Sequence, residues 1–327
     1  MLVGVQLPEH SYHGDPLDEL TGLVETAGAA VVGRLTQKRQ APDAAAYIGQ
    51  GKVDELKFLV DATEADVVIF DNDLSPAQIR NLEEALKVKV LDRTEVILDI
   101  FSSRAQTHEA RLAVELAQLE YSLPRLKGMW THLSRMKMGV GMRGPGEKQL
   151  ETDRRLAERR IRDLRRDLEV VQRRKEREVA GRRDRSTVSL VGYTNAGKST
   201  LMNALTGSDV LAENKLFATL DPTVRRTSLP NGQEVLLSDT VGFIQKLPTT
   251  LVAAFRATLE ELGTADLLLH VLDISSENAA EQAATVDEVL AELDLGEKPR
   301  LLVLNKVDRL LPPERIARAT PAELLEE

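Results

Sequence analysis

The stretch Gly192-Tyr193-Thr194-Asn195-Ala196-Gly197-Lys198-Ser199 decides the fold of this chain of 327 residues. It follows the apolar run Val188–Val191, which predicts a buried strand, and precedes Thr200–Leu205, which predicts the start of a helix. Glycines let the backbone N–H groups turn towards a phosphate, and the helix N-terminus adds partial positive charge. The order strand, loop, helix therefore predicts a phosphate-binding loop, with a chance glycine-rich turn as the alternative.

Side chains at the end of this loop have separate predicted tasks. We expect Lys198 to reach the β- and γ-phosphates of a nucleotide and the Ser199 hydroxyl to ligate Mg²⁺. Thr200 follows them as a further nucleotide contact. Downstream, Phe217-Ala218-Thr219-Leu220-Asp221 falls in the region that folds over a γ-phosphate. A threonine there completes the Mg²⁺ shell, and we predict Thr219, with Thr223 as the alternative.

A second loop is predicted to sense the γ-phosphate. Asp239-Thr240-Val241-Gly242 follows the predicted strand Glu234–Ser238. We expect Asp239 to hold Mg²⁺ through water and the Gly242 N–H to contact the γ-phosphate. Loss of that phosphate would release both loops, which predicts a switch.

The last motif concerns the base. The strand Arg300–Leu304 ends in Asn305-Lys306-Val307-Asp308, a pattern that recognises guanine. The Asp308 carboxylate accepts from N1–H and the exocyclic amine, while Asn305 contacts the other edge. Adenine has no donor at N1, so the carboxylate would lose a partner. Together the motifs predict a GTP-binding and GTP-hydrolysing protein that uses Mg²⁺.

Two residues bear on how GTP would be hydrolysed. Phe243 stands where Ras-like switches carry the glutamine that orients the attacking water, so water must be positioned by another group. Asn195 occupies the place that potassium-activated GTPases use to hold K⁺ beside the phosphates. We hypothesise that K⁺ offsets transition-state charge, as an arginine finger does elsewhere. We therefore assign Lys198, Asn195, Thr219 and Gly242 to catalysis.

Composition narrows the class of protein. The 43 Lys+Arg and 52 Asp+Glu residues give a net charge of −9, which excludes a generic nucleic-acid coat. The absence of cysteine excludes disulfides and thiolate metal sites. The start of the chain lacks the pattern of a signal peptide, and no apolar run approaches the roughly 20 residues that span a bilayer. We expect a cytoplasmic monomer.

Residues 1–102 predict a small α/β domain. Short apolar runs that predict strands alternate with helical patterns; the runs are Val3–Val5, Ala29–Gly33, Asp66–Phe70 and Val88–Leu91. Ser75-Pro76 predicts a capped helix start. Gly49-Gln50-Gly51-Lys52 predicts a turn before the helix Lys52–Asp61 rather than a second phosphate loop, because no Ser or Thr follows the lysine.

Residues 103–185 predict an antiparallel helical hairpin with a glycine-rich tip loop at 139–146. The apolar seams are Leu112, Leu116, Leu119, Leu123 and Ala157, Ile161, Leu164, Leu168, Val171. Between Arg143 and Arg185 stand 16 Arg/Lys and 10 Asp/Glu. A basic arm on an acidic protein suits contact with an RNA backbone, although a solvated helix is equally compatible, and the tip could be a plain linker.

With these residues in hand, the chain resembles the HflX family of ribosome-associated translational GTPases. The phosphate loop, Phe217–Asp221 and the arm stretch Gly144-Pro145-Gly146-Glu147-Lys148-Gln149-Leu150-Glu151-Thr152-Asp153 carry the resemblance. It implies binding to the large ribosomal subunit and its rRNA near the peptidyl-transferase centre, and GTP-dependent splitting or rescue of stalled ribosomes. Some members also hydrolyse ATP, so the preference for guanine is expected to be incomplete.

The chain departs from the family's pattern after Asp308. The resemblance implies a Ser-Ala loop behind the guanine, a sixth strand and a closing helix, whereas Arg309–Glu327 shows only helical character. We therefore expect an α/β P-loop GTPase domain at 186–327, truncated at its C-terminus, with an unpaired sheet edge and weakened affinity. Alternative functions are a nucleotide-dependent rRNA-binding module with little turnover and a ribosome-assembly GTPase.

Overall fold

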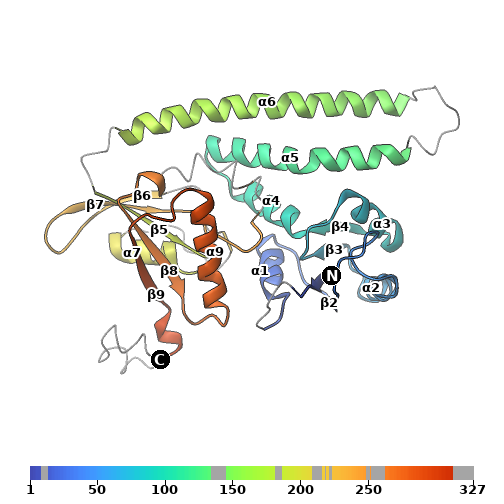
Figure 1. Cartoon of the computed structure of the whole chain (residues 1–327), viewed down its shortest axis with the longest axis horizontal. Coiled ribbons are helices and arrows are strands. Elements are labelled where there is room, and N and C mark those ends of the chain that lie inside the picture. Colours follow the sequence, from blue (N-terminus) through green and yellow to red (C-terminus); the bar gives the residue numbers. More distant parts are fainter. Residues whose placement is uncertain are drawn as a thin grey trace. The chain divides into compact units, whose positions relative to one another are not determined.

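A computed structural model describes residues 1–8, 14–133, 145–180, 186–207, 216–217, 219–220, 223–247, 251 and 262–311 (Figure 1). The chain forms two compact units, the first containing Met1–Arg174 and Leu251 and the second containing Lys175–Leu247 and residues from Arg256 onward. Each is described by itself. The predicted α/β class is confirmed, whereas the domain boundaries 1–102, 103–185 and 186–327 stay predictions.

The first unit contains a four-stranded parallel sheet with the order β2-β1-β3-β4. Its strands are β1 (Leu2–Gln6), β2 (Arg34–Lys38), β3 (Val67–Phe70) and β4 (Lys89–Asp92). The helices are α1 (Asp18–Thr26), α2 (Gln50–Thr63), α3 (Pro76–Leu86) and α4 (Arg93–Arg104). Apolar side chains from the sheet pack against Leu56 of α2 and Leu82 of α3 to form the core.

Local signals in this sheet were predicted with mixed success. The Ser75 cap is confirmed, because Ser75 Oγ accepts from the Gln78 N–H at 3.3 Å while Gln78 Oε1 accepts from the Ser75 N–H at 2.9 Å. The strand predicted at Ala29–Gly33 is wrong, since β2 is the polar segment that follows it. An edge strand with alternating exposure needs only every second side chain to be apolar, so an apolar run is a poor guide to it.

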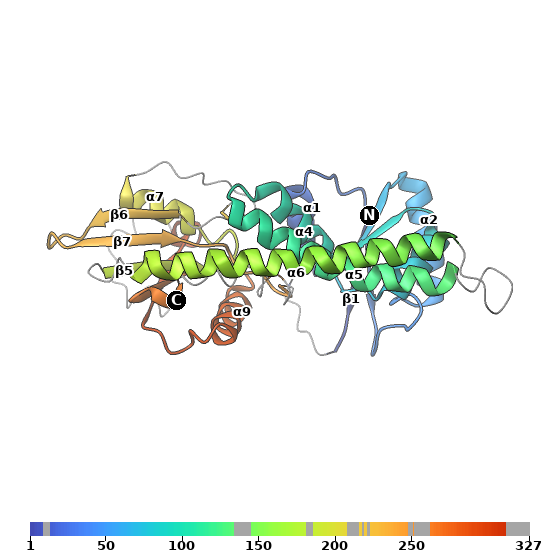
Figure 2. The same ribbon diagram turned by 90° about the horizontal axis from the view of Figure 1, so that it is seen from above.

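The arm consists of α5 (His108–Leu133) and α6 (Pro145–Ala180), which run side by side in Figures 1 and 2. Leu112 and Leu116 of α5 are buried against Ile161 and Leu164 of α6, so the predicted apolar seam is confirmed. The predicted tip loop 139–146 needs correction at its end, because α6 already begins at Pro145, a favourable first helical position. Residues 134–144 lie outside the described residues.

Ion pairs join the two helices of the arm beside the apolar seam. Arg160 holds both carboxylate oxygens of Glu115 at 2.7 Å, and Arg165 contacts Glu120 at 2.7 Å. These pairs are exposed, so each contributes at most about 1 kcal/mol. The apolar seam therefore supplies most of the packing energy of the arm.

The second unit contains a five-stranded sheet with the order β6-β7-β5-β8-β9. Its parallel strands are β5 (Ser186–Gly192), β7 (Glu234–Asp239), β8 (Leu267–Asp273) and β9 (Arg300–Asn305), and β6 (Thr223–Ser228) runs antiparallel to β7. Its helices include α7 (Lys198–Thr206), α9 (Ala279–Glu292) and the 3-10 helix η1 (Val307–Arg309).

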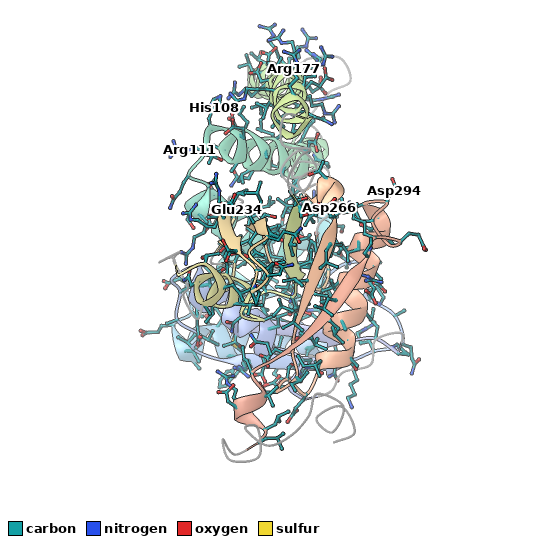
Figure 3. All side chains as sticks on the ribbon, turned by 90° about the vertical axis from the view of Figure 1, so that its left-hand side faces the viewer. His108, Arg111, Arg177, Glu234, Asp266 and Asp294 are labelled. Atoms are coloured by element: carbon teal, nitrogen blue, oxygen red, sulfur yellow. The ribbon has the colours of Figure 1, made fainter. Side chains whose placement is uncertain are left out.

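The two ends of these parallel strands differ. Glu234 and Asp266, labelled in Figure 3, mark the amino ends of β7 and β8. All predicted nucleotide motifs lie at the opposite, carboxyl ends, where ligands bind in open α/β sheets. Within the described residues β9 forms one edge of the sheet, and its Leu301 and Leu302 are 55% and 50% exposed. Residues 312–327 lie outside the described residues.

Candidate nucleotide site

The phosphate loop connects β5 to α7 through two positions that only glycine can occupy. Gly192 has φ 151° and Gly197 has φ 100°, both in the region that side chains rarely adopt. A Cβ on Gly192 would lie 2.3 Å from the Val271 carbonyl oxygen, and one on Gly197 would lie 2.2 Å from Asn305 Nδ2. The neighbouring strands β8 and β9 therefore determine where the loop runs.

Lys198 begins α7 and is buried under the loop. Its Nζ donates to the carbonyl oxygens of Gly192 at 3.0 Å and Tyr193 at 2.9 Å. Burial lowers the pKa of Lys198 to about 8, against the opposing attraction of Asp239. The ammonium is thus held at the loop by neutral oxygen atoms, which a phosphate can supplement or replace.

Ser199, Thr219 and Asp239 meet beside this lysine. The hydroxyls of Ser199 and Thr219 donate to Asp239 Oδ2 at 2.6 Å and 3.1 Å, and the two hydroxyl oxygens are 2.8 Å apart. The other carboxylate oxygen, Asp239 Oδ1, is buried without a hydrogen-bond partner in the described part of the chain. Hard oxygen atoms with one unsatisfied carboxylate oxygen fit Mg²⁺, so the assignment of these residues to the metal stays a supported prediction. Thr223 instead lies opposite Asp239 in the β6–β7 ladder.

The second predicted switch segment, Asp239–Gly242, leads directly into Phe243, whose backbone is hydrogen-bonded to the phosphate loop. The Phe243 N–H donates to the Gly192 carbonyl at 3.1 Å, and the Thr194 N–H donates to the Phe243 carbonyl at 2.7 Å. A Cβ on Gly242 would lie 2.6 Å from Thr194 Cα, so the chain passes very close here. Phe243 itself is fully buried. Its side chain therefore packs in the core and does not face a position for attacking water.

The base motif is also tied to the phosphate loop. Asn305 Nδ2 donates to the Ala196 carbonyl at 2.7 Å, and Lys306 Nζ donates to the Asn195 carbonyl at 2.8 Å. Lys306 also pairs with Asp273 at 2.7 Å, at the end of β8. Burial favours a higher pKa for Asp273, but hydrogen bonds from Lys306 and Ser275 outweigh it and hold the pKa below its usual value.

Sequence reasoning missed Asp273, although an aspartate that ends an apolar strand is itself a signal. The other predicted residues have simpler surroundings. Thr240 Oγ1 donates to the Leu190 carbonyl at 2.7 Å, Val241 and Leu220 are buried, and Thr200 is exposed on α7. Val307 and Asp308 lie in η1, directly after β9. Ala218 and Asp221 lie outside the described residues.

Comparison with known proteins identifies the family. Family models match residues 14–102 as "GTP-binding GTPase N-terminal", 104–182 as "GTP-binding GTPase Middle Region" and 187–306 as "50S ribosome-binding GTPase". GTPase HflX of Caldanaerobacter subterraneus subsp. tengcongensis is 52% identical over 90% of this chain and 70% of that protein. The chain belongs to the HflX family of GTPases. GTPase HflX of Escherichia coli K12 is 51% identical, again over 90% of this chain and 70% of its own length.

Two solved structures with bound GDP are similar to this HflX-family chain over most of its length. SsGBP in complex with GDP is 30% identical, with a TM-score of 0.52, over 97% of this chain and 85% of that one. A GTP-binding protein of Sulfolobus solfataricus, also with GDP, is 26% identical, with a TM-score of 0.50, over 99% and 86% of the two chains. None of the helices within the described ranges has the length and apolar character that a membrane crossing requires.

Proposed function

We propose that this HflX-family GTPase binds the large ribosomal subunit near the peptidyl-transferase centre and uses GTP to split or rescue stalled ribosomes. The observation that carries the proposal is a basic helical arm in the same chain as a GTP switch domain. The family description of residues 187–306 as a 50S ribosome-binding GTPase supports it. Hydrolysis would then release the factor, because loss of the γ-phosphate frees the switch segments.

The outer face of α6 supplies the proposed contact with rRNA. Arg159, Arg166 and Arg173 are exposed and follow one another at intervals of seven residues, so they project from one side of the helix, about 10 Å apart. Figure 3 shows side chains of α6 projecting outward, with Arg177 labelled among them. By contrast, Arg160, Arg165 and Arg174 are paired with glutamates of α5. Arg166 and Arg173 also pair, with Asp163 at 3.3 Å and Glu169 at 4.0 Å within α6. Exposed pairs of this kind are weak, so phosphates can compete for these guanidinium groups.

The chain's own residues would prepare GTP for hydrolysis. Lys198 would reach the phosphates, Ser199 and, through water, Asp239 would hold the metal ion, and Thr219 would complete its shell. Mg²⁺ bound there would neutralise charge on the β- and γ-phosphates. Asp308 accepts from the guanine edge, which favours GTP over ATP. Asn195, whose backbone is held by Lys306, is the proposed ligand for K⁺.

Sedimentation of ribosomes through a sucrose gradient tests the proposal. With the chain and a non-hydrolysable GTP analogue, 70S particles should separate into subunits and the protein should sediment with the large one. With GDP, 70S particles should persist. Intact 70S particles in both conditions, with the protein at the top of the gradient, would rule out ribosome splitting.

A matched pair of variants tests the arm. Arg159→Gln/Arg166→Gln removes two charges from the outer face of α6 and should weaken binding to large subunits, with a shallower salt dependence. Arg225→Gln/Arg226→Gln removes two charges from β6 and should leave ribosome binding unchanged. Equal weakening by both pairs would mean that net charge, not the arm, governs binding.

Turnover measurements separate the remaining alternatives. Stimulation of GTP hydrolysis by large subunits favours the proposed function, whereas binding without stimulated turnover favours an RNA-binding module. Association with immature subunits alone would favour a role in ribosome assembly. The proposed role of Asn195 as a K⁺ ligand is tested by measuring the rate of GTP hydrolysis in KCl and in NaCl. Equal rates would exclude the K⁺ hypothesis.

A further inference from the structure

Thr194 bonds to both segments that follow the phosphate loop, and it uses a different group for each. Its Oγ1 accepts from the Phe217 N–H at 2.9 Å, and its own N–H donates to the Phe243 carbonyl at 2.7 Å. The residue is only 6% exposed, so water competes little for either bond. Changing the side chain can therefore remove the bond to Phe217 and leave the bond to Phe243 in place.

Phe217 is held in an unfavourable backbone conformation. It has φ 55°, in the left-handed region that is disfavoured for a large side chain, and it is 1% exposed. Such a conformation persists only where surrounding contacts impose it. Two such contacts are the burial of the Phe217 ring and the hydrogen bond that the Phe217 N–H donates to Thr194 Oγ1.

The position of Phe217 matters because Thr219 follows it by two residues. With Phe217 held against the loop, the Thr219 hydroxyl reaches both Ser199 and Asp239. Only a nucleotide with a γ-phosphate needs the Thr219 hydroxyl in this position, since a diphosphate has no γ-phosphate beside it. Any bond that holds the Thr219 hydroxyl there should therefore favour the triphosphate.

We infer that Thr194 is a positioning residue whose hydroxyl holds Phe217, and through it the Thr219 hydroxyl, in place and thereby sets the preference for GTP over GDP. The inference rests on the proposed role of Thr219 at the metal. It assigns to Thr194 a function beyond lining the loop: its hydroxyl acts through Phe217 and Thr219 and touches no reacting atom.

Thr194→Val tests the inference, because valine keeps the branched shape and loses the acceptor. The affinities for a fluorescent non-hydrolysable GTP analogue and for fluorescent GDP are measured in Mg²⁺ and in EDTA. We expect the variant to lose about tenfold in affinity for the analogue in Mg²⁺, the effect of an unmade buried hydrogen bond. The ratio of analogue affinity to GDP affinity should therefore fall about tenfold, and Thr194→Ser, which keeps the hydroxyl, should restore that ratio.

Two further variants complete the test, one as a control and one as a replacement for Thr194→Val. Thr285→Val on α9 removes a hydroxyl that donates to the Glu281 carbonyl at 2.9 Å, and should change neither affinity. Thr194→Ala removes the same acceptor as Thr194→Val without adding a methyl group, so it replaces that variant if valine disturbs folding. GDP affinity reports whether each variant retains a folded site.

The outcomes distinguish this inference from the proposed metal role. An equal loss for both nucleotides, or no loss for either, would overturn the positioning role of Thr194. Thr219→Val is measured in parallel. If it leaves Mg²⁺-dependent binding of the analogue unchanged, the proposed metal role of Thr219 fails. If Thr219→Val loses affinity while Thr194→Val and Thr194→Ala do not, only the inference fails.

Discussion

The parallel strands of the first unit end in charged groups that neutralise one another. After β3 and β4, Arg93 is 3% exposed and contacts Asp71 at 2.8 Å, and it also pairs with Glu19. Asp92 is fully buried, accepts from the Glu95 N–H at 3.0 Å and is bonded by Tyr121 and Arg125 of α5. These buried charges are compensated from within the protein, as stability requires.

The parallel strands of the second unit end differently. Lys198 is buried against two carbonyl oxygens rather than a carboxylate, and Asp239 Oδ1 has no hydrogen-bond partner among the described residues. Both arrangements carry a desolvation cost that a bound phosphate and metal would offset. The same edge of a parallel sheet can thus be completed by its own side chains or left for a ligand. Four predictions test this contrast.

The largest effect is expected at Lys198. Lys198→Ala removes the buried ammonium, and we expect a loss of at least about 1000-fold in GDP affinity, or about 4 kcal/mol. Isothermal titration calorimetry measures it. Thermal stability without nucleotide should not fall, because an uncompensated buried charge has been removed. A marked destabilisation would contradict our description of this edge.

At the corresponding edge of the first unit, Arg93→Met should act on stability instead. Removing the guanidinium leaves Asp71 and Glu19 without it, which should lower the free energy of unfolding by about 3 kcal/mol. Urea denaturation followed by circular dichroism measures this. GDP affinity should be unchanged. A loss of GDP affinity at temperatures where the variant is folded would show that both edges serve the nucleotide.

Asp308→Ala tests the base contact at the end of β9. Loss of the carboxylate should lower GTP affinity by about 10- to 100-fold, the range for a hydrogen bond to a charged group. ATP affinity should change little, so selectivity should largely disappear. Competition between the two nucleotides measures the ratio. An equal loss for both would contradict guanine recognition by Asp308.

The smallest predicted effect is on pH dependence. Because burial lowers the pKa of Lys198 to about 8, the ligand-free protein loses this charge as pH rises above 8. A phosphate favours the charged form, so GDP affinity should fall by less than about tenfold between pH 8 and 9. Over the same range the ligand-free protein should become more stable, because the unfolded chain binds more protons. A flat affinity profile would contradict the assigned role of Lys198.

Sequence patterns did not predict several elements of the structure. The helix α4 and the strand β6 were not predicted, because neither carries a strong periodic apolar signal. Helix α5 continues through Pro124, whereas the predicted seam stopped at Leu123. Neighbouring packing overrides these local signals, since a proline removes only one bond from a helix that is otherwise supported.

The phosphate loop was predictable because its function depends on local backbone geometry. Gly192, Gly197, Lys198 and Ser199 act over eight consecutive residues, so their spacing alone identifies the loop. The same holds for Asn305–Asp308, where a short motif follows an apolar strand. By itself the sequence therefore determined the nucleotide class, the order of the motifs and the family.

Only the tertiary structure shows that the Thr219 hydroxyl reaches Asp239, 20 positions further along the chain, and this contact supports the prediction of Thr219 as a metal ligand. It also revealed the bond from Thr194 to Phe217, which joins residues 23 apart, and the unpartnered oxygen of Asp239. Contacts of this kind depend on how separate segments meet after folding. No local pattern encodes them, because each side chain is ordinary in its own stretch of sequence.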